Sequence, residues 1–118
     1  IQEQTKQNVI SVIKHFPGHG SSLGDSHKGF VDVSETWKIE ELDPYKALIK
    51  EKKVDMIMTA HVFNKHIDKE HPATLSYKFN TQILRNMLKF KGVIISDDLQ
   101  TKAISDKYSL KERVTLAI

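Results

Sequence analysis

One unit of sequence occurs three times along the chain: a short apolar run, polar residues at its end, and then a stretch with helical periodicity. The apolar runs cover residues 9–16, 54–61 and 93–95. Runs of this length that are rich in β-branched residues are typical of buried strands. Strands that alternate with helices connect through right-handed crossovers. We therefore predict an α/β chain with a parallel sheet covered by helices.

Helix signals lie between the predicted strands. Asp43 is predicted to cap one helix, with Pro44 at its first position. Ser76 is predicted to cap a second helix over residues 77–90, where apolar residues recur every three or four positions. A last helix is predicted from about residue 102 to the end, with a break near Ser109.

The chain has 118 residues, whereas a closed (β/α)8 barrel takes about 250. It begins at Ile1 without a methionine and stops inside the last predicted helix. We therefore expect part of a longer protein, with about three βα units and parallel strands. The two architectures compatible with this pattern are a segment of a TIM-type (β/α)8 barrel and a small open sheet.

Composition excludes some classes of function. The formal net charge is +3, and the basic residues are interspersed with acidic ones, which argues against a nucleic-acid partner or a membrane surface. The chain contains no cysteine, so it has neither a disulfide framework nor a thiolate site. No apolar run approaches the length needed to span a membrane.

Residues capable of chemistry gather at the ends of the predicted strands. In parallel α/β folds the active site lies at the carboxyl ends of the strands, so these residues are candidates for one site. They are Lys14, His15, Thr59, His61, Asp97 and Asp98.

The stretch KHFPGHGSSLGDSHK runs from the end of the first predicted strand into the loop that follows, and it holds three of the six histidines. Asp25 can accept a hydrogen bond from one ring nitrogen of His27, which leaves the other nitrogen for proton transfer. The alternative is a surface turn in which both residues are structural. His19, between two glycines, is expected to shape the turn.

The remaining candidates keep alternative interpretations. Asp97 can be a nucleophile, a helix cap or a metal ligand. Asp98 suits the helix-capping role better, because consecutive residues in a strand point to opposite sides. Lys14 and His15 can contact hydroxyl groups or anions, or only pack at the strand end. His61 can line the same pocket or be a packed, hydrogen-bonded histidine. No HExxH-like spacing is present, so neither a metal nor another cofactor is expected.

Read together, the motifs KHFPGHG, DSH, IMTAHV, HPATLS and GVIISDDLQ resemble family 3 glycoside hydrolases. Within that family the chain is similar to the bacterial β-N-acetylglucosaminidase (β-hexosaminidase) branch. The resemblance covers nearly the whole chain. It implies a partial catalytic TIM-barrel domain over residues 1–118, in which the three predicted strands are the fifth, sixth and seventh of the barrel.

The resemblance also implies roles for single residues. Asp97 corresponds to the nucleophile of a retaining mechanism, and His27 corresponds to the general acid/base with Asp25 as its partner. Lys14 and His15 correspond to contacts with N-acetylglucosamine. The implied substrates are N-acetylglucosaminides, including peptidoglycan fragments.

Three alternatives remain open at this point. Some members of the family use phosphate rather than water as the acceptor. The chain can also be a carbohydrate-binding relic that keeps Lys14 and His15, or an inactive fragment. Taken alone, the segment is expected to be inactive and to self-associate through exposed sheet edges.

Overall fold

The structure, a computed structural model, describes residues 1–24 and 28–118. Two residues with predicted roles, Asp25 and His27, therefore lie outside the described residues. The elements below are those of the described part.

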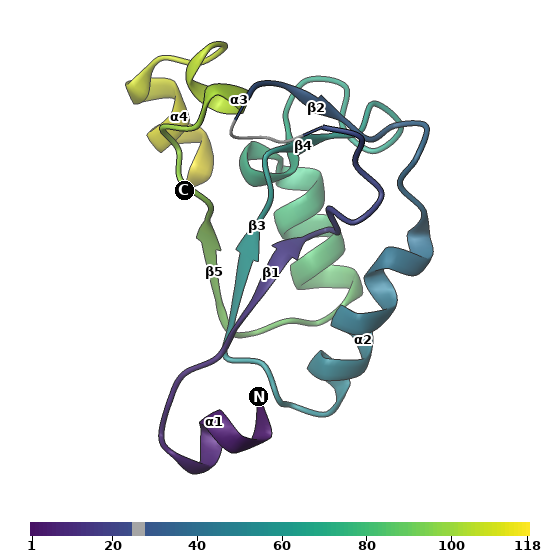
Figure 1. The fold of residues 1–118 in the computed structure, drawn as a ribbon, viewed down its shortest axis with the longest axis vertical. Coiled ribbons are helices and arrows are strands. Elements are labelled where there is room, and N and C mark those ends of the chain that lie inside the picture. The colour runs from purple at the N-terminus through teal and green to yellow at the C-terminus, as the bar shows by residue number, and fades with distance from the viewer. Residues whose placement is uncertain (25–27) are drawn as a thin grey trace.

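The main sheet contains three parallel strands in the order β1 (Val12–Phe16), β3 (Met56–Thr59) and β5 (Val93–Ser96). In Figure 1 the three arrows point toward the end of the molecule that carries α3, β2 and β4. The predicted parallel sheet is confirmed, and the carboxyl ends of its strands meet at one edge.

The first strand begins later than predicted, because the residues before it close a short helix, α1 (Gln2–Lys6). The amide of Val9 donates a hydrogen bond to the carbonyl oxygen of Gln4 at 2.9 Å, so it does not take part in a strand ladder. Val9 and Ile10 are 50% and 66% exposed. The predicted second strand is likewise shorter at both ends.

Helix α2 (Asp43–Lys50) follows a short helix, η1 (Ile39–Leu42). Pro44 lies in its first turn, as predicted, but the predicted Asp43 cap is wrong. The N-cap is Leu42, and the Asp43 carboxylate instead accepts from Lys46 Nζ at 2.8 Å within the first turn.

The helix between β3 and β5 is η3 (Lys78–Met87), a π-helix. Its wider turns are visible in the bond from the Leu88 amide to the Ile83 carbonyl oxygen, 2.9 Å long. Ser76 was predicted to cap this helix, and its hydroxyl accepts from the Phe79 amide at 3.2 Å.

The predicted break in the last helix is confirmed. Helix α3 (Lys102–Ser105) and helix α4 (Leu110–Ala117) are separate. Ser109 begins α4 with a capping box, in which its hydroxyl accepts from the Glu112 amide and the Glu112 carboxylate accepts from the Ser109 amide.

A second, two-stranded parallel sheet lies beyond the carboxyl ends of the main sheet (Figure 1). Its strands are β2 (Val31–Asp32) and β4 (Val62–Phe63), in regions predicted as irregular or loop. The short helix η2 (Ala73–Leu75) follows β4. Strands of two residues lie below the length at which a periodic pattern can be recognised.

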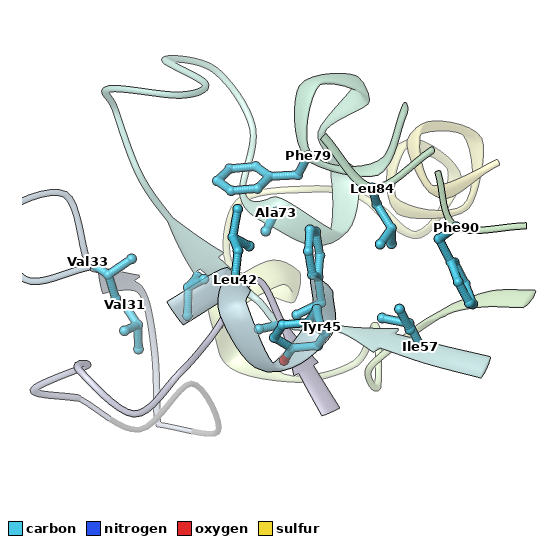
Figure 2. Packing of buried hydrophobic residues seen from close by; sticks show 12 residues of the cluster. Val31, Val33, Leu42, Tyr45, Ile57, Ala73, Phe79, Leu84 and Phe90 are labelled. Carbon is cyan, nitrogen blue, oxygen red and sulfur yellow. The ribbon is translucent and has the colours of Figure 1, made fainter. Parts of the chain in front are cut away.

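The core forms on one face of the main sheet. Ile13, Ile57 and Ile94 are paired in register across the three strands and belong to one apolar cluster with residues of α2 and η3. Figure 2 shows Tyr45 and Leu84 beside Ile57 in this cluster. Because side chains alternate along a strand, Lys14, Met58 and Ile95 take the opposite face.

Among the described residues, none of the helices is long and apolar enough to cross a membrane. Nor does that part of the chain bring together three or more histidine or acidic side chains in a way that could hold a metal ion.

Candidate active site

Strand β1 ends in a bulge that places His15. Lys14 pairs with Met58 and Phe16 pairs with Thr59, so His15 is the extra residue between two ladder positions. Bulges re-aim a side chain and are common next to active sites. In a regular strand, alternation would let one of the consecutive residues Lys14 and His15 face a pocket and turn the other away. The bulge removes this restriction because it interrupts the alternation of side chains.

Asp97 directly follows strand β5. Its amide donates to the carbonyl oxygen of Thr59 at 3.2 Å, which fixes its backbone to the middle strand. Within the described residues, both oxygens of the Asp97 carboxylate have a polar neighbour. Oδ1 accepts from the Asp98 amide at 2.8 Å, and Oδ2 lies 3.3 Å from Nε2 of His15. The structure thus brings together two of the predicted site residues from strands that are not neighbours.

The His15 and Asp97 side chains are 31% and 21% exposed, respectively. They are therefore partly desolvated but still within reach of a molecule that arrives from solvent. A carboxylate in this setting can act as a nucleophile, and an imidazole beside it can hold its orientation.

Lys14 is exposed, and together with His15 it lines a cavity of about 750 Å³. The other walls come from the loop after β1, from η1 with Glu41 and from α2 with Tyr45. Asp97 does not line this cavity. The candidate active site is therefore defined by the His15–Asp97 pair, with the cavity adjoining it on the side of β1.

His61 is almost fully buried, at 1% exposure. Its Nδ1 lies 2.9 Å from Oγ1 of Thr74, and its Nε2 lies 2.8 Å from the carbonyl oxygen of Asp98. The ring therefore connects the segment after β3 to the segment after β5.

The described part of the loop after β1 is held by side chains that sequence reasoning missed. Trp37 Nε1 donates to the Pro17 carbonyl oxygen at 3.1 Å, and the Ser21 hydroxyl donates to the Glu41 carboxylate at 2.5 Å. Gly18 has φ of +124°, and a Cβ there would collide with Glu41. No pattern in the sequence indicates these partners, because they are about twenty residues away in an irregular region.

His19 has the turn-shaping role expected of it. Its Nδ1 lies 2.6 Å from the Ser22 hydroxyl, and its carbonyl oxygen accepts from the Ser22 amide at 3.2 Å. Its ring meets that of His15 edge to face, with 6.3 Å between the centroids.

Asp98 is structural, although it does not cap the next helix as its position suggested. Its carboxylate accepts from the Gln100 amide at 2.9 Å, and its carbonyl oxygen accepts from the Thr101 amide at 3.1 Å. Thr101, rather than Asp98, is the N-cap of α3.

The glycosyl hydrolase family 3 N terminal domain matches residues 1–118, the full length of the chain. The chain belongs to glycosyl hydrolase family 3. A beta-hexosaminidase from Photobacterium profundum is 42% identical over 99% of this chain. The beta-hexosaminidase A of Pseudoalteromonas piscicida is 38% identical over 86% of it.

A solved family 3 structure, the β-N-acetylglucosaminidase from Paenibacillus sp. str. FPU-7, matches 98% of the chain with a TM-score of 0.90 and 34% identity. The fold class is therefore that of a segment of the TIM-type barrel of family 3, rather than a small open sheet. The chain spans 35% of the Photobacterium relative, 19% of the Pseudoalteromonas relative and 23% of the Paenibacillus chain.

Proposed function

We propose that this family 3 chain is the part of a retaining exo-β-N-acetylglucosaminidase that carries the nucleophile and the general acid/base. The proposal depends mainly on one observation, the 3.3 Å approach of His15 to the Asp97 carboxylate at the carboxyl end of the sheet. In barrels of this class the reacting groups lie at that end. The relatives named beta-hexosaminidase support an N-acetylhexosamine as the sugar.

In the first step, a carboxylate oxygen of Asp97 attacks the anomeric carbon of a terminal β-linked N-acetylglucosamine. The bond from this carbon to the glycosidic oxygen breaks, and His27 gives its proton to the leaving oxygen. The product is a covalent glycosyl ester of Asp97, which divides one difficult displacement into two.

In the second step, His27 takes a proton from water, and the resulting hydroxide attacks the anomeric carbon. The ester bond breaks, which restores the Asp97 carboxylate and releases the sugar with its original configuration. Asp25 orients the His27 ring. The roles of Asp25 and His27 rest on their match to the DSH motif of the family, because both lie outside the described residues.

Lys14 and His15 would bind the sugar. An ammonium group offers three donors to hydroxyl oxygens, and the exposed Lys14 side chain suits this task. His15 would have two functions, since it also holds Asp97. In this proposal β1, β3 and β5 are the fifth to seventh strands of the barrel, and the isolated chain is inactive because the remaining sugar contacts come from other strands.

The test uses the intact protein that carries this chain, with an aryl β-N-acetylglucosaminide as substrate. Removal of a covalent nucleophile lowers kcat about 10⁴-fold or more, so the kcat of Asp97→Ala should be lower by this factor. His27→Ala should lose about 100-fold or more on a substrate with a poor leaving group. Asp106→Asn, which changes a carboxylate after α3, is the matched control and should retain full activity.

Two results would contradict the proposal. Full hydrolysis by Asp97→Ala would remove the nucleophile assignment. If NMR detects the α-anomer of the sugar as the first product, a retaining mechanism is excluded. If a sugar phosphate forms in phosphate buffer, the enzyme is a phosphorylase with the same nucleophile rather than a hydrolase.

A further inference from the structure

We propose that His61 is a positioning residue for Asp97 rather than a contact to the sugar. It acts by donating Nε2–H to the carbonyl oxygen of Asp98, the residue that follows the proposed nucleophile. The inference rests on the proposed function, because it assigns a purpose to the placement of Asp97. It replaces the expectation that His61 lines the substrate pocket.

Burial is the first argument. His61 is 1% exposed, and both of its ring nitrogens lie within hydrogen-bonding distance of groups in the chain. Thr74, the partner of Nδ1, is 2% exposed. A sugar hydroxyl would have to displace one of these buried partners to reach the ring.

The partners also determine which nitrogen carries the proton. A carbonyl oxygen only accepts, so Nε2 must be protonated to bond to Asp98 at 2.8 Å. The other ring nitrogen, Nδ1, lies 2.9 Å from the Thr74 hydroxyl. Partners at both nitrogens fix the orientation of the ring.

The contact with Thr74 holds the ring on its other side. The Thr74 hydroxyl donates to the carbonyl oxygen of Ala60 at 2.7 Å. Its oxygen lies 2.9 Å from Nδ1 of His61. The bond from Nε2 to Asp98 does not depend on the direction of this second bond, because the Asp98 carbonyl oxygen can only accept.

The consequence for Asp97 is that its backbone is tied to the segment around the end of β3 on both sides. Its own amide donates to the Thr59 carbonyl oxygen at 3.2 Å, and the following carbonyl is held by His61. The carboxylate bonds to the amide between these two points, at 2.8 Å. A movement of the Asp97 backbone that takes the carboxylate away from His15 would have to break one of the two backbone hydrogen bonds, and a rotation of the side chain alone would break the bond to the Asp98 amide.

The test compares three substitutions in the intact protein that carries this chain. The amide nitrogen of Gln lies where Nε2 does, so His61→Gln can keep the donor to Asp98. The amide of Asn lies where Nδ1 does, so His61→Asn can keep only the Thr74 contact. His61→Leu keeps neither. His66→Gln, at an exposed histidine that pairs with Glu35, is the control for replacing a histidine.

Two measurements are made on each variant that is folded at the assay temperature. The first is kcat and KM on the aryl β-N-acetylglucosaminide. A displacement of about 1 Å at a reacting group costs about 100-fold, so His61→Leu and His61→Asn should lose about this factor in kcat with little change in KM. His61→Gln should keep most of the activity. The second is the rate of amide hydrogen exchange in peptides that cover residues 96–101. This rate should rise in His61→Leu and His61→Asn but not in His61→Gln.

A rise in KM with kcat retained in all three variants would show that His61 contacts the sugar, and the proposal would be wrong. Equal losses in His61→Gln and His61→Leu would also overturn it, because the donor to Asp98 would then be irrelevant. If the unsubstituted protein releases no sugar, the proposed function is wrong. The hydrogen-exchange measurement then tests the His61–Asp98 hydrogen bond on its own. Equal exchange of residues 96–101 in all variants would refute the claim that this bond holds the segment around Asp97.

Discussion

The carboxylate of Asp68 holds together the segment that leads to Thr74, and its replacement should be costly. Its Oδ1 accepts from the amides of Glu70 and His71 at 2.9 and 3.1 Å, and its Oδ2 accepts from the Ser76 hydroxyl at 2.5 Å. The residue is 6% exposed. Asp68→Ala would leave three donors without their acceptor.

The three donors do not contribute equally. A hydrogen bond to a charged group is worth about 1.5–3 kcal/mol, and less where water can replace the partner. Glu70 is exposed and His71 is partly exposed, so water can reach their amides. Ser76 is fully buried, at 0% exposure, so its hydroxyl cannot be rescued in this way. We expect Asp68→Ala to lower the free energy of unfolding by about 3 kcal/mol and Asp68→Asn by about 1–2 kcal/mol.

The effect should depend on pH. Burial acts to raise the pKa of Asp68, but the hydrogen bonds from Ser76, Glu70 and His71 outweigh it and hold the pKa below its ordinary value of 3.8. A carboxyl group with a lowered pKa in the folded state stabilises the protein above its ordinary pKa. That stabilisation is lost as the pH falls through the lowered pKa.

The assay is urea unfolding of the protein and of Asp68→Asn at about pH 7 and about pH 3. The difference in the free energy of unfolding between them should be largest at neutral pH and should shrink in acid, because below pH 3.8 the unfolded chain takes up the proton first and part of the stabilisation by the Asp68 carboxylate is lost. Asp106→Asn should show no difference at either pH. An equal destabilisation by Asp68→Asn at both pH values would refute the argument, because the charge would then contribute nothing.

Three further outcomes are expected. Gly92→Ala should destabilise the protein by about 1–3 kcal/mol in urea unfolding, because a Cβ there would collide with a backbone carbonyl oxygen, whereas Gly20→Ala meets no atom within 4 Å and should be neutral. Burial raises the pKa of Tyr45 to about 12, so an alkaline absorbance titration should contain a late phase that Tyr45→Phe lacks. The isolated chain should sediment above 13.5 kDa through its sheet edges, where Val12 and Val93 are 38% and 52% exposed, and lysine at both positions should reduce this association.

The main elements could be predicted from the sequence because each depends on a local pattern. The β-branched run before Phe16 favours a strand, and the hydroxyls of Ser76 and Ser109 accept from amides three residues away. The helix α1 and the two-residue strands β2 and β4 could not be predicted. All three are too short for periodicity, and β2 and β4 form because each offers hydrogen-bonding partners to the other from a distant part of the chain.

The candidate site was predictable as a list of residues but not as a geometry. Because the carboxyl ends of parallel strands meet at one edge, the sequence predicted that His15 and Asp97, at the ends of two apolar runs, lie at that edge. It could not show that they touch, because the contact depends on the bulge in β1. Nor could it show that His61 is buried with a partner at each ring nitrogen. One of these partners is Thr74, which is thirteen residues away in the HPATL stretch.

The contact between His15 and Asp97 depends on register as much as on residue type. Neighbouring strands lie about 4.8 Å apart, so β1 and β5, with β3 between them, are separated by about 10 Å. An imidazole and a carboxylate can bridge such a gap only if both reach over the same face of the middle strand. Without the bulge, the alternation of side chains along β1 would place the His15 ring on the opposite face of the sheet from Lys14. The bulge between Lys14 and Phe16 lets the ring come within 3.3 Å of the carboxylate while Phe16 stays in the core. The sheet can therefore combine a packed face and a reactive edge within three consecutive residues.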